Sequence, residues 1–339
     1  MDLHIVWFVL IGILLTGFFV LEGYDYGVGI LLPFLGKSDN ERRMVLNSIG
    51  PFWDGNEVWL ITAGGAMFAA FPNWYATLFS SFYLEMFGIL FALILRGAAF
   101  EFRSLHESPR WRTTWDWVIF TGSLLPGFFA GIILANILRG IPIDTHMNYT
   151  GNALTMFNPY ALLTGITLVV LFALHGAIFI NLRVTGPLVE RSRKAAQLLW
   201  LPTIVFVLLF AIVSYVLSDT FRHLFLNPRI APVGDLMIVA LVSVGWLVYR
   251  KRDGLAFAMT CLTIGLAAAT ICLGLFPNVL ISSLNPAWNL TVTNAASGPY
   301  TLQVMSWLAL TLLPFVLLYQ GWSYWVFRRR IQAHAVGHY

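Results

Sequence analysis

The chain has 339 residues, of which 58% are apolar and 15% aromatic, while only 11% carry a charge. This composition excludes an ordinary soluble domain, because about a quarter of the residues in such domains are charged. The formal net charge of +4 does not indicate nucleic-acid binding, since the basic residues lie in short clusters between apolar runs. We therefore expect a single integral membrane domain over residues 1–339, in contact with lipid and not with nucleic acid.

Nine apolar runs follow one another along the chain, and a transmembrane helix needs about 20 such residues. The expected spans are 5–34, 51–71, 76–100, 115–138, 160–182, 198–218, 233–249, 254–276 and 302–327. The predicted fold class is an all-α polytopic membrane protein with nine transmembrane helices. We expect two four-helix bundles, with possible halves at 1–140 and 155–276, plus a peripheral last helix at 302–327.

The positions of the basic residues predict the orientation of the chain. If the N-terminus lies outside, the cytoplasmic segments hold sixteen of the twenty Lys and Arg residues and the external segments hold three, while Arg96 lies within the third span. The sixteen form five clusters, at 37–43, 103–112, 183–194, 250–252 and 328–330. Because basic residues concentrate in cytoplasmic loops, this asymmetry predicts an external N-terminus and a cytoplasmic C-terminus.

Acidic residues in the first two expected spans are the candidate functional residues. Glu22 and Asp25 in the first span are spaced i, i+3, as are Asp54 and Glu57 in the second, so each pair shares a helix face. Carboxyls within hydrocarbon are costly unless compensated, and they commonly mark proton relays. No basic residue is identified at the same depth. The acids therefore predict a proton path that rises as a ladder from the cytoplasm.

Two interpretations of the neighbouring charged residues remain open from sequence alone. Asp54 and Glu57 follow Pro51, and acidic residues also stabilise the first turn of a helix without any further function. Arg96, near the cytoplasmic end of the third span, either extends to the membrane interface or pairs with the acids. Glu85 lies eleven residues earlier on the same span, so it cannot pair with Arg96.

Cysteine and histidine positions argue against a redox metal held by this chain. Cys261 and Cys272 lie eleven residues apart in one apolar run, which suits neither a disulfide framework nor a thiolate site. His175 is the only histidine expected deep in the membrane. Haem ligation is one interpretation, but a histidine without a partner at matching depth is more often a hydrogen-bonded packing residue. We expect no metal site and no catalytic residue.

Four motifs in chain order resemble subunit II of cytochrome bd quinol oxidases. They are EGYDYGVGILLP at 22–33, WDGNEVWL at 53–60, RGAAFEFR at 96–103 and NAASGPYTL at 294–302. The resemblance implies a haem-poor second subunit of an electrogenic quinol:dioxygen oxidoreductase in the bacterial cell membrane, not catalytic alone. The chain departs from the family in carrying Glu57 where relatives often have an amide, and Glu22 where many have Asp.

The resemblance also implies partners and cofactors. A haem-bearing subunit I would hold two haems b and haem d, a small single-helix accessory subunit would join in some complexes, and quinol and dioxygen would be the substrates. In relatives, the position of Asp54 is associated with a proton route and that of Trp59 with a dioxygen channel. A structural quinone is bound in some relatives, whereas no cofactor is expected to be ligated by this chain itself.

Two other functions fit the same residues. A proton-coupled secondary transporter also uses buried acids on glycine-interrupted helices, although the later spans contain no second acid-bearing hairpin. A purely structural membrane subunit would brace its partner and carry no protons.

Overall fold

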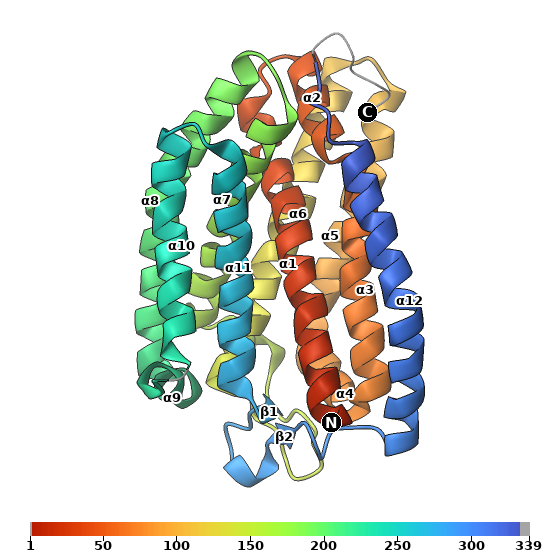
Figure 1. Cartoon of the computed structure of the whole chain (residues 1–339), viewed down its shortest axis with the longest axis vertical. Coiled ribbons are helices and arrows are strands. Elements are labelled where there is room, and N and C mark those ends of the chain that lie inside the picture. Colours follow the sequence, from red (N-terminus) through yellow and green to blue (C-terminus); the bar gives the residue numbers. More distant parts are fainter. Residues whose placement is uncertain (1, 229, 333–339) are drawn as a thin grey trace.

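The computed structural model describes residues 2–228 and 230–332, and its long helices run side by side along the molecule (Figure 1). Within the described residues, eight helices are long and apolar enough to cross a bilayer. They are α1 (Leu3–Leu35), α5 (Tyr83–Phe102, extended by the 3-10 turn η1, Arg103–Leu105), α6 (Pro109–Arg139), α7 (Pro159–Arg183), α8 (Pro187–Leu217), α10 (Ala231–Tyr249), α11 (Asp253–Leu275) and α12 (Pro299–Val326). The structure is thus mostly helical, as the predicted fold class required, with the addition of a short two-stranded sheet.

The second expected span corresponds to α3 (Trp53–Ala70), which is not among those eight helices. Its first turns carry Asp54, Asn56 and Glu57, and these polar side chains lower the mean hydropathy of the helix. α3 packs against α1 and α12 and runs beside them in Figure 1. The count of nine spans therefore stays a prediction, as does the division into two bundles.

The third expected span, 76–100, is divided in the structure. α4 (Pro72–Ser81) is followed by Phe82, where φ is −106° and ψ is 32°, and α5 begins at the next residue, Tyr83. These angles lie outside the helical range, so the chain turns there. The prediction of one continuous helix from residue 76 was wrong. The aromatic rings of Phe71, Trp74 and Phe82 pack into the protein core. In the sequence they are as apolar as the residues of a transmembrane helix, so the break between α4 and α5 was not apparent.

The five basic clusters of the sequence gather at one end of the molecule, the upper end in Figure 1, which we call the basic end. The amphipathic helix α2 (Asp39–Ile49) lies here and begins with a capping box formed by Ser38 and Glu41. Short elements also lie at the opposite end. They are α4, α9 (Asp219–Leu226), the 3-10 turns η2 (Ala153–Met156) and η3 (Pro286–Trp288), and an antiparallel hairpin of β1 (Asn278–Leu280) and β2 (Leu290–Thr291).

Backbone contact between α1 and α7 holds the centre of the molecule together. A Cβ atom on Gly27 would lie 1.9 Å from the carbonyl oxygen of Phe172, and one on Gly176 would lie 2.4 Å from the carbonyl carbon of Gly27. Neither position has room for a side chain, so the helices cross at glycine, as small residues allow in membrane proteins. This crossing buries the segment of α1 that carries Glu22 and Asp25.

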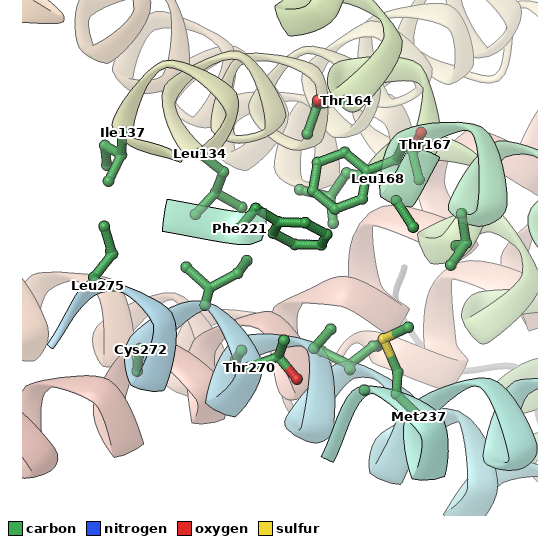
Figure 2. A pocket seen from close by; sticks show the side chains of 18 of the residues that line it. Leu134, Ile137, Thr164, Thr167, Leu168, Phe221, Met237, Thr270, Cys272 and Leu275 are labelled. Carbon is green, nitrogen blue, oxygen red and sulfur yellow. The ribbon is translucent and has the colours of Figure 1, made fainter. Parts of the chain in front are cut away.

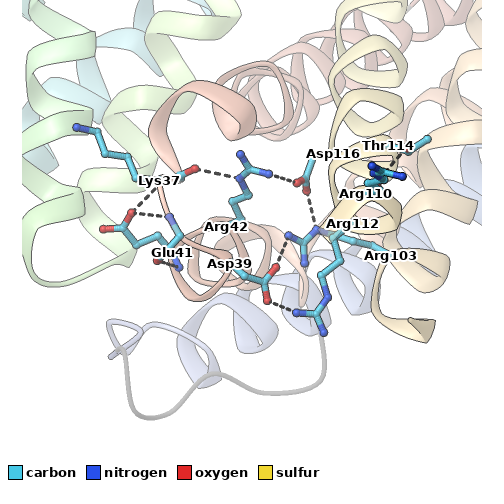
Figure 3. Close-up of polar contacts among 11 residues, drawn as sticks. Lys37, Asp39, Glu41, Arg42, Arg103, Arg110, Arg112, Thr114 and Asp116 are labelled. Atoms are coloured by element: carbon cyan, nitrogen blue, oxygen red, sulfur yellow. Dashed lines mark hydrogen bonds and ion pairs between the residues drawn. The ribbon is translucent and has the colours of Figure 1, made fainter. Parts of the chain in front are cut away.

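A network of alternating charges fixes α2 to α6 and η1 at the basic end (Figure 3). The Asp116 carboxylate accepts hydrogen bonds from Arg42 Nη1 at 2.7 Å and from Arg103 Nε at 2.6 Å. The Asp39 carboxylate accepts from Arg103 Nη2 at 2.8 Å and from Arg112 Nη1 at 2.7 Å. Because α3 follows α2 directly, this network also sets where α3 begins.

Glu41 connects α2 to α8 through an ion pair with Arg191. Burial of the Glu41 carboxyl opposes its ionisation. Hydrogen bonds from Arg191 and from the backbone N–H groups of Lys37 and Ser38, together with the Arg191 charge, outweigh burial and lower the pKa of Glu41. Its carboxylate is therefore the favoured form in the folded protein.

Replacing Asp116 with Asn removes the charge that Arg42 and Arg103 share. Asp116 is fully buried, and breaking a buried ion pair from one side costs about 3–5 kcal/mol. We expect Asp116→Asn to lower the unfolding temperature of the purified protein, measured by differential scanning calorimetry. Glu107→Gln is the matched control, because Glu107 is an exposed acid in the adjacent loop. An equal effect of both substitutions would contradict the prediction.

The lowered pKa of Glu41 makes its contribution to stability depend on pH. A carboxyl whose pKa is lowered by folding stabilises the protein above its unfolded-state pKa, and this stabilisation is lost as pH falls through the folded-state pKa. We expect Glu41→Gln to reduce the unfolding temperature at neutral pH, with a difference that shrinks below about pH 4. Thermal scans across pH measure this. Glu101→Gln, at an exposed acid on α5, is the control, and a pH-independent difference would refute the account.

Candidate functional site

The structure brings together three of the four acids singled out from the sequence. Glu22 and Asp25 on α1 are both fully buried, with 0% of their surface exposed. Glu57 on α3 is half-buried, with 19% of its side chain exposed. Asp54, one helical turn before Glu57, is exposed on the outer side of α3. The acids thus run from an exposed position to a fully buried one.

Arg96 on α5 is the basic partner of two of these acids, Glu22 and Glu57. Its Nη1 atom donates to Glu22 Oε1 at 2.5 Å and to Glu57 Oε1 at 2.9 Å, and the whole residue is buried. The expectation of an acid ladder without a basic residue at the same depth was therefore wrong. Of the two alternatives for Arg96, pairing with the acids is the one observed. Positions along single helices do not show how far a long side chain reaches between helices.

α5 packs closely on α6 at the position of Arg96, and aromatic rings surround the buried guanidinium. A Cβ on Gly122 of α6 would lie 2.8 Å from the Cβ of Arg96. The guanidinium carbon lies 5.2 Å from the ring centre of Tyr26 and 5.3 Å from that of Phe100. Such cation–π contacts partly compensate the loss of water around a buried cation.

Asn56 is the hub of a second group of polar contacts, between α1, α3 and α12. Its Nδ2 donates to Asp25 Oδ2 at 2.6 Å and to Tyr24 Oη at 2.7 Å. Its Oδ1 accepts from Tyr324 Oη at 3.1 Å and from Gln320 Nε2 at 3.4 Å. The two tyrosine hydroxyls lie 2.5 Å apart. These contacts join the buried acids to the peripheral helix α12.

Sequence reasoning missed Asn56 and the two tyrosines, Tyr24 and Tyr324. The signal for Asn56 was its place within the polar run between Asp54 and Glu57 on α3. Tyr324 gave no such signal, because tyrosine near the end of a membrane helix usually marks the lipid interface.

Trp59 lies between α1 and α12. Its ring packs on Gly17, where a Cβ would lie 2.3 Å from the ring atoms, and its Nε1 donates to Gln320 Oε1 at 2.9 Å. The described contacts show Trp59 as a half-buried link that holds α12. Its association with a dioxygen channel stays a prediction.

His175 uses both of its ring nitrogens within the protein. Nε2 lies 3.0 Å from the carbonyl oxygen of Val20, which can only accept, so Nε2 carries a proton. Nδ1 lies 2.7 Å from Thr260 Oγ1, and the ring stacks on Phe257 at 4.8 Å. These contacts favour the packing interpretation of His175 over haem ligation. Among the residues that the structure describes, no cluster of three or more His, Cys, Asp or Glu side chains could hold a metal ion.

An apolar cavity of about 520 Å³ lies on the other side of α1, among α7, α8, α9, α10 and α11 (Figure 2). Its wall is formed by side chains such as Leu168, Phe221, Met237 and Leu275, with the Thr164 and Thr167 hydroxyls among its few polar groups. Cys272 also lines the cavity. Cys272 and Cys261 are both free thiols in separate turns of α11, as expected for packing residues.

The comparison with known protein families identifies the family to which the chain belongs. The family described as "Cytochrome bd terminal oxidase subunit II" matches residues 3–327. The chain belongs to this family. The resemblance seen in the four sequence motifs is thereby confirmed, and the chain is a subunit of an oxidoreductase complex in the bacterial cell membrane, which it spans several times.

Individual relatives agree along nearly the whole chain. The chain is 46% identical to "Cytochrome bd ubiquinol oxidase subunit 2" of Bacillus subtilis over 330 residues, covering 97% of both proteins. It is 38% identical to "Cytochrome bd-I ubiquinol oxidase subunit 2" of Escherichia coli, covering 97% of this chain and 95% of that one. A chain of "The structure of bd oxidase from Geobacillus thermodenitrificans" superposes with a TM-score of 0.77 over 97% of this chain and 100% of that chain, at 17% identity. That likeness shows the fold.

Proposed function

We propose that this subunit carries cytoplasmic protons toward the dioxygen-reducing centre of its quinol oxidase complex. The observation that carries the proposal is the fully buried Asp25, which is hydrogen-bonded to Asn56 and lies one helical turn from the Glu22–Arg96 ion pair. Buried carboxyls of this kind are costly in hydrocarbon, and they are kept where a proton has to be held and passed on.

The exposure of the acids indicates the direction of transfer. The side chains of Asp54 and Glu57 reach the surface of the described chain, whereas those of Glu22 and Asp25 are fully buried. A proton would reach Glu57 from the side of Asp54, then Glu22, and then Asp25. Carboxyl groups can accept a proton and release it again, whereas the Asn56 amide only donates from Nδ2 and therefore positions Asp25.

Asp25→Asn in the assembled oxidase tests this function. The substitution keeps the shape of the side chain and a carbonyl oxygen for Asn56, but it cannot carry a proton. We expect oxygen consumption to fall by about a hundredfold with haem content unchanged. Asp219→Asn, at an exposed acid on α9, should leave both unchanged. Normal oxygen consumption by Asp25→Asn would instead favour a purely structural subunit.

We propose that the haem-bearing subunit packs on the exposed face of α3. This face carries Asp54, Val58, Ile61, Gly65 and Phe68, which recur at helical spacing and are all exposed. An acidic side chain on this face would be costly against lipid tails, whereas a protein partner can pair it. A Cβ on Gly65 would meet no atom of this chain, so there is room for close approach by a partner helix.

Bulky substitutions on two exposed faces test the docking surface. Ile61 on α3 is 72% exposed and Val239 on α10 is 64% exposed. We expect Ile61→Trp to reduce the amount of haem-bearing subunit that co-purifies with the chain, because a large ring blocks close packing. Val239→Trp is the matched control on a helix remote from α3 (Figure 1). Equal recovery of the partner with both variants would argue against this surface.

The proposed function also includes the orientation of the chain in the membrane and the location of the haems. The basic end would face the cytoplasm, with α3 as a ninth span, because five basic clusters lie at that end. The haems would be held by the partner, which is supported by the engagement of both His175 nitrogens within this chain. A small accessory subunit would add a further helix to the complex.

The apolar cavity would hold the hydrophobic tail of a structural quinone. Its apolar lining fits such a tail, and the Thr164 and Thr167 hydroxyls offer a few polar contacts. Trp59 would border a dioxygen route between α1 and α12, a position consistent with its half-buried ring. The alternative of a proton-coupled transporter is disfavoured, because the two relatives described above are oxidase subunits.

A further inference from the structure

Three carboxyls lie around the centre of α1, and two of them, Glu22 and Glu57, share one guanidinium. Glu22 and Glu57 both accept from Arg96 Nη1, and Asp25 lies one turn from Glu22 on the same face of α1. If all three carboxyls were ionised, the cluster would carry a net charge of −2 in a buried site. Charge that is not compensated is costly there. Neutrality therefore requires that the cluster hold two protons in addition to those of Arg96.

Six buried polar atoms in this region have no hydrogen-bond partner within the protein. They are Glu22 Oε2, Asp25 Oδ1, Tyr26 Oη, Arg96 Nε and Nη2, and Ser123 Oγ. Buried polar atoms are nearly always paired, and where protein groups do not reach them, ordered water does. A buried water makes about three hydrogen bonds, so the six atoms suit about two water molecules.

These atoms lie on helices that pack against one another. Ser123 of α6 faces α1, since a Cβ on Gly29 would lie 2.0 Å from its Oγ. Ser123 also follows Gly122, which touches Arg96, and the guanidinium lies over the Tyr26 ring. The unpaired atoms thus belong to three packed helices, α1, α5 and α6, around one guanidinium.

We propose that Arg96 organises a buried, hydrated proton-holding cluster in which Glu22, Asp25 and Glu57 share two exchangeable protons through bound water. The proposal rests on the proton-carrying function proposed above. Arg96 is a positioning residue: it stays protonated throughout and holds Glu22 and Glu57 within reach of the same water. When one proton leaves the cluster, the site gains one negative charge, and a proton arriving at Glu57 from the cytoplasmic side restores neutrality.

Other titratable groups lie on the helices that carry or surround the cluster. They are Tyr24 and Tyr26 on α1, Asp54 on α3, Glu85, Glu101 and Arg103 on α5, Asp116 on α6, His175 and Arg183 on α7, and Tyr324 on α12. Asp116 is engaged by Arg42 and Arg103, and both nitrogens of His175 are hydrogen-bonded. Among the described residues, Arg96 is the cation that directly contacts the acids Glu22 and Glu57.

Arg96→Met and Arg96→Lys in the assembled oxidase separate this role from simple bracing of the helices. Without the cation, the carboxyls release protons only at higher pH. We therefore expect Arg96→Met to lower oxygen consumption by about tenfold, to raise the pH of half-maximal activity and to increase the solvent deuterium isotope effect. Arg96→Lys keeps the charge but loses the planar fork, so it should restore the pH profile and part of the rate.

A double variant tests the cluster even if Arg96→Met alone does not assemble with its partner. If Arg96→Met fails to assemble, Arg96→Met/Glu22→Gln removes the cation and one acid together. We expect normal haem content but still a low rate and a raised isotope effect. Arg139→Met, at an exposed arginine on α6, is the control and should match the unmodified oxidase.

The outcomes distinguish this inference from the function on which it rests. An assembled Arg96→Met or double variant with an unchanged pH profile and isotope effect overturns the hydrated cluster, even if Asp25→Asn is inactive. A fully active Asp25→Asn variant overturns the proton-carrying function itself. An Arg96→Lys variant whose pH profile matches that of Arg96→Met also overturns the inference, because it would show that the charge at this position does not matter.

Discussion

Compensation of charge inside an apolar protein is the constraint on which the rest of this structure depends. Glu22 can be buried at the centre of α1 because Arg96 reaches it from α5, and the same guanidinium holds the half-buried Glu57 of α3. One ion-pair cluster therefore joins three helices. Gly122 of α6 lies against the Cβ of Arg96, so the absence of a side chain there lets α5 and α6 approach closely beside the cluster.

The two sides of α1 differ in chemistry. On the side of α3, α5 and α12, polar groups concentrate around Asn56 and Arg96. On the side of α7 to α11, the side chains that line the cavity in Figure 2 are mostly apolar, and both ring nitrogens of the buried His175 on α7 are hydrogen-bonded. The glycine crossing of α1 and α7 lies between the two sides, and neither Gly27 nor Gly176 has room for a side chain.

The ion pairs at the basic end hold helices together. The arginines at this end pair with Asp39 and Asp116, which holds the amphipathic helix α2 against α6 (Figure 3), and the pair of Glu41 with Arg191 holds α2 against α8. These pairs fix the start of α3, and with it the depth at which Glu57 meets Arg96. The basic residues thereby influence the position of Glu57 through one short helix, α2.

The sequence by itself determined the features that depend on local composition and spacing. Apolar runs located most of the membrane helices, the i, i+3 spacing of Glu22 and Asp25 placed them on one face, and four motifs indicated the family that the comparisons confirmed. Tertiary structure alone decided contacts between residues far apart in the chain. Arg96 meets Glu22 across 74 positions, and Asn56 meets Tyr324 across 268, so neither pairing has a signal within any single helix. The break at Phe82 was likewise decided by packing, because buried aromatic rings and lipid-facing residues are equally apolar.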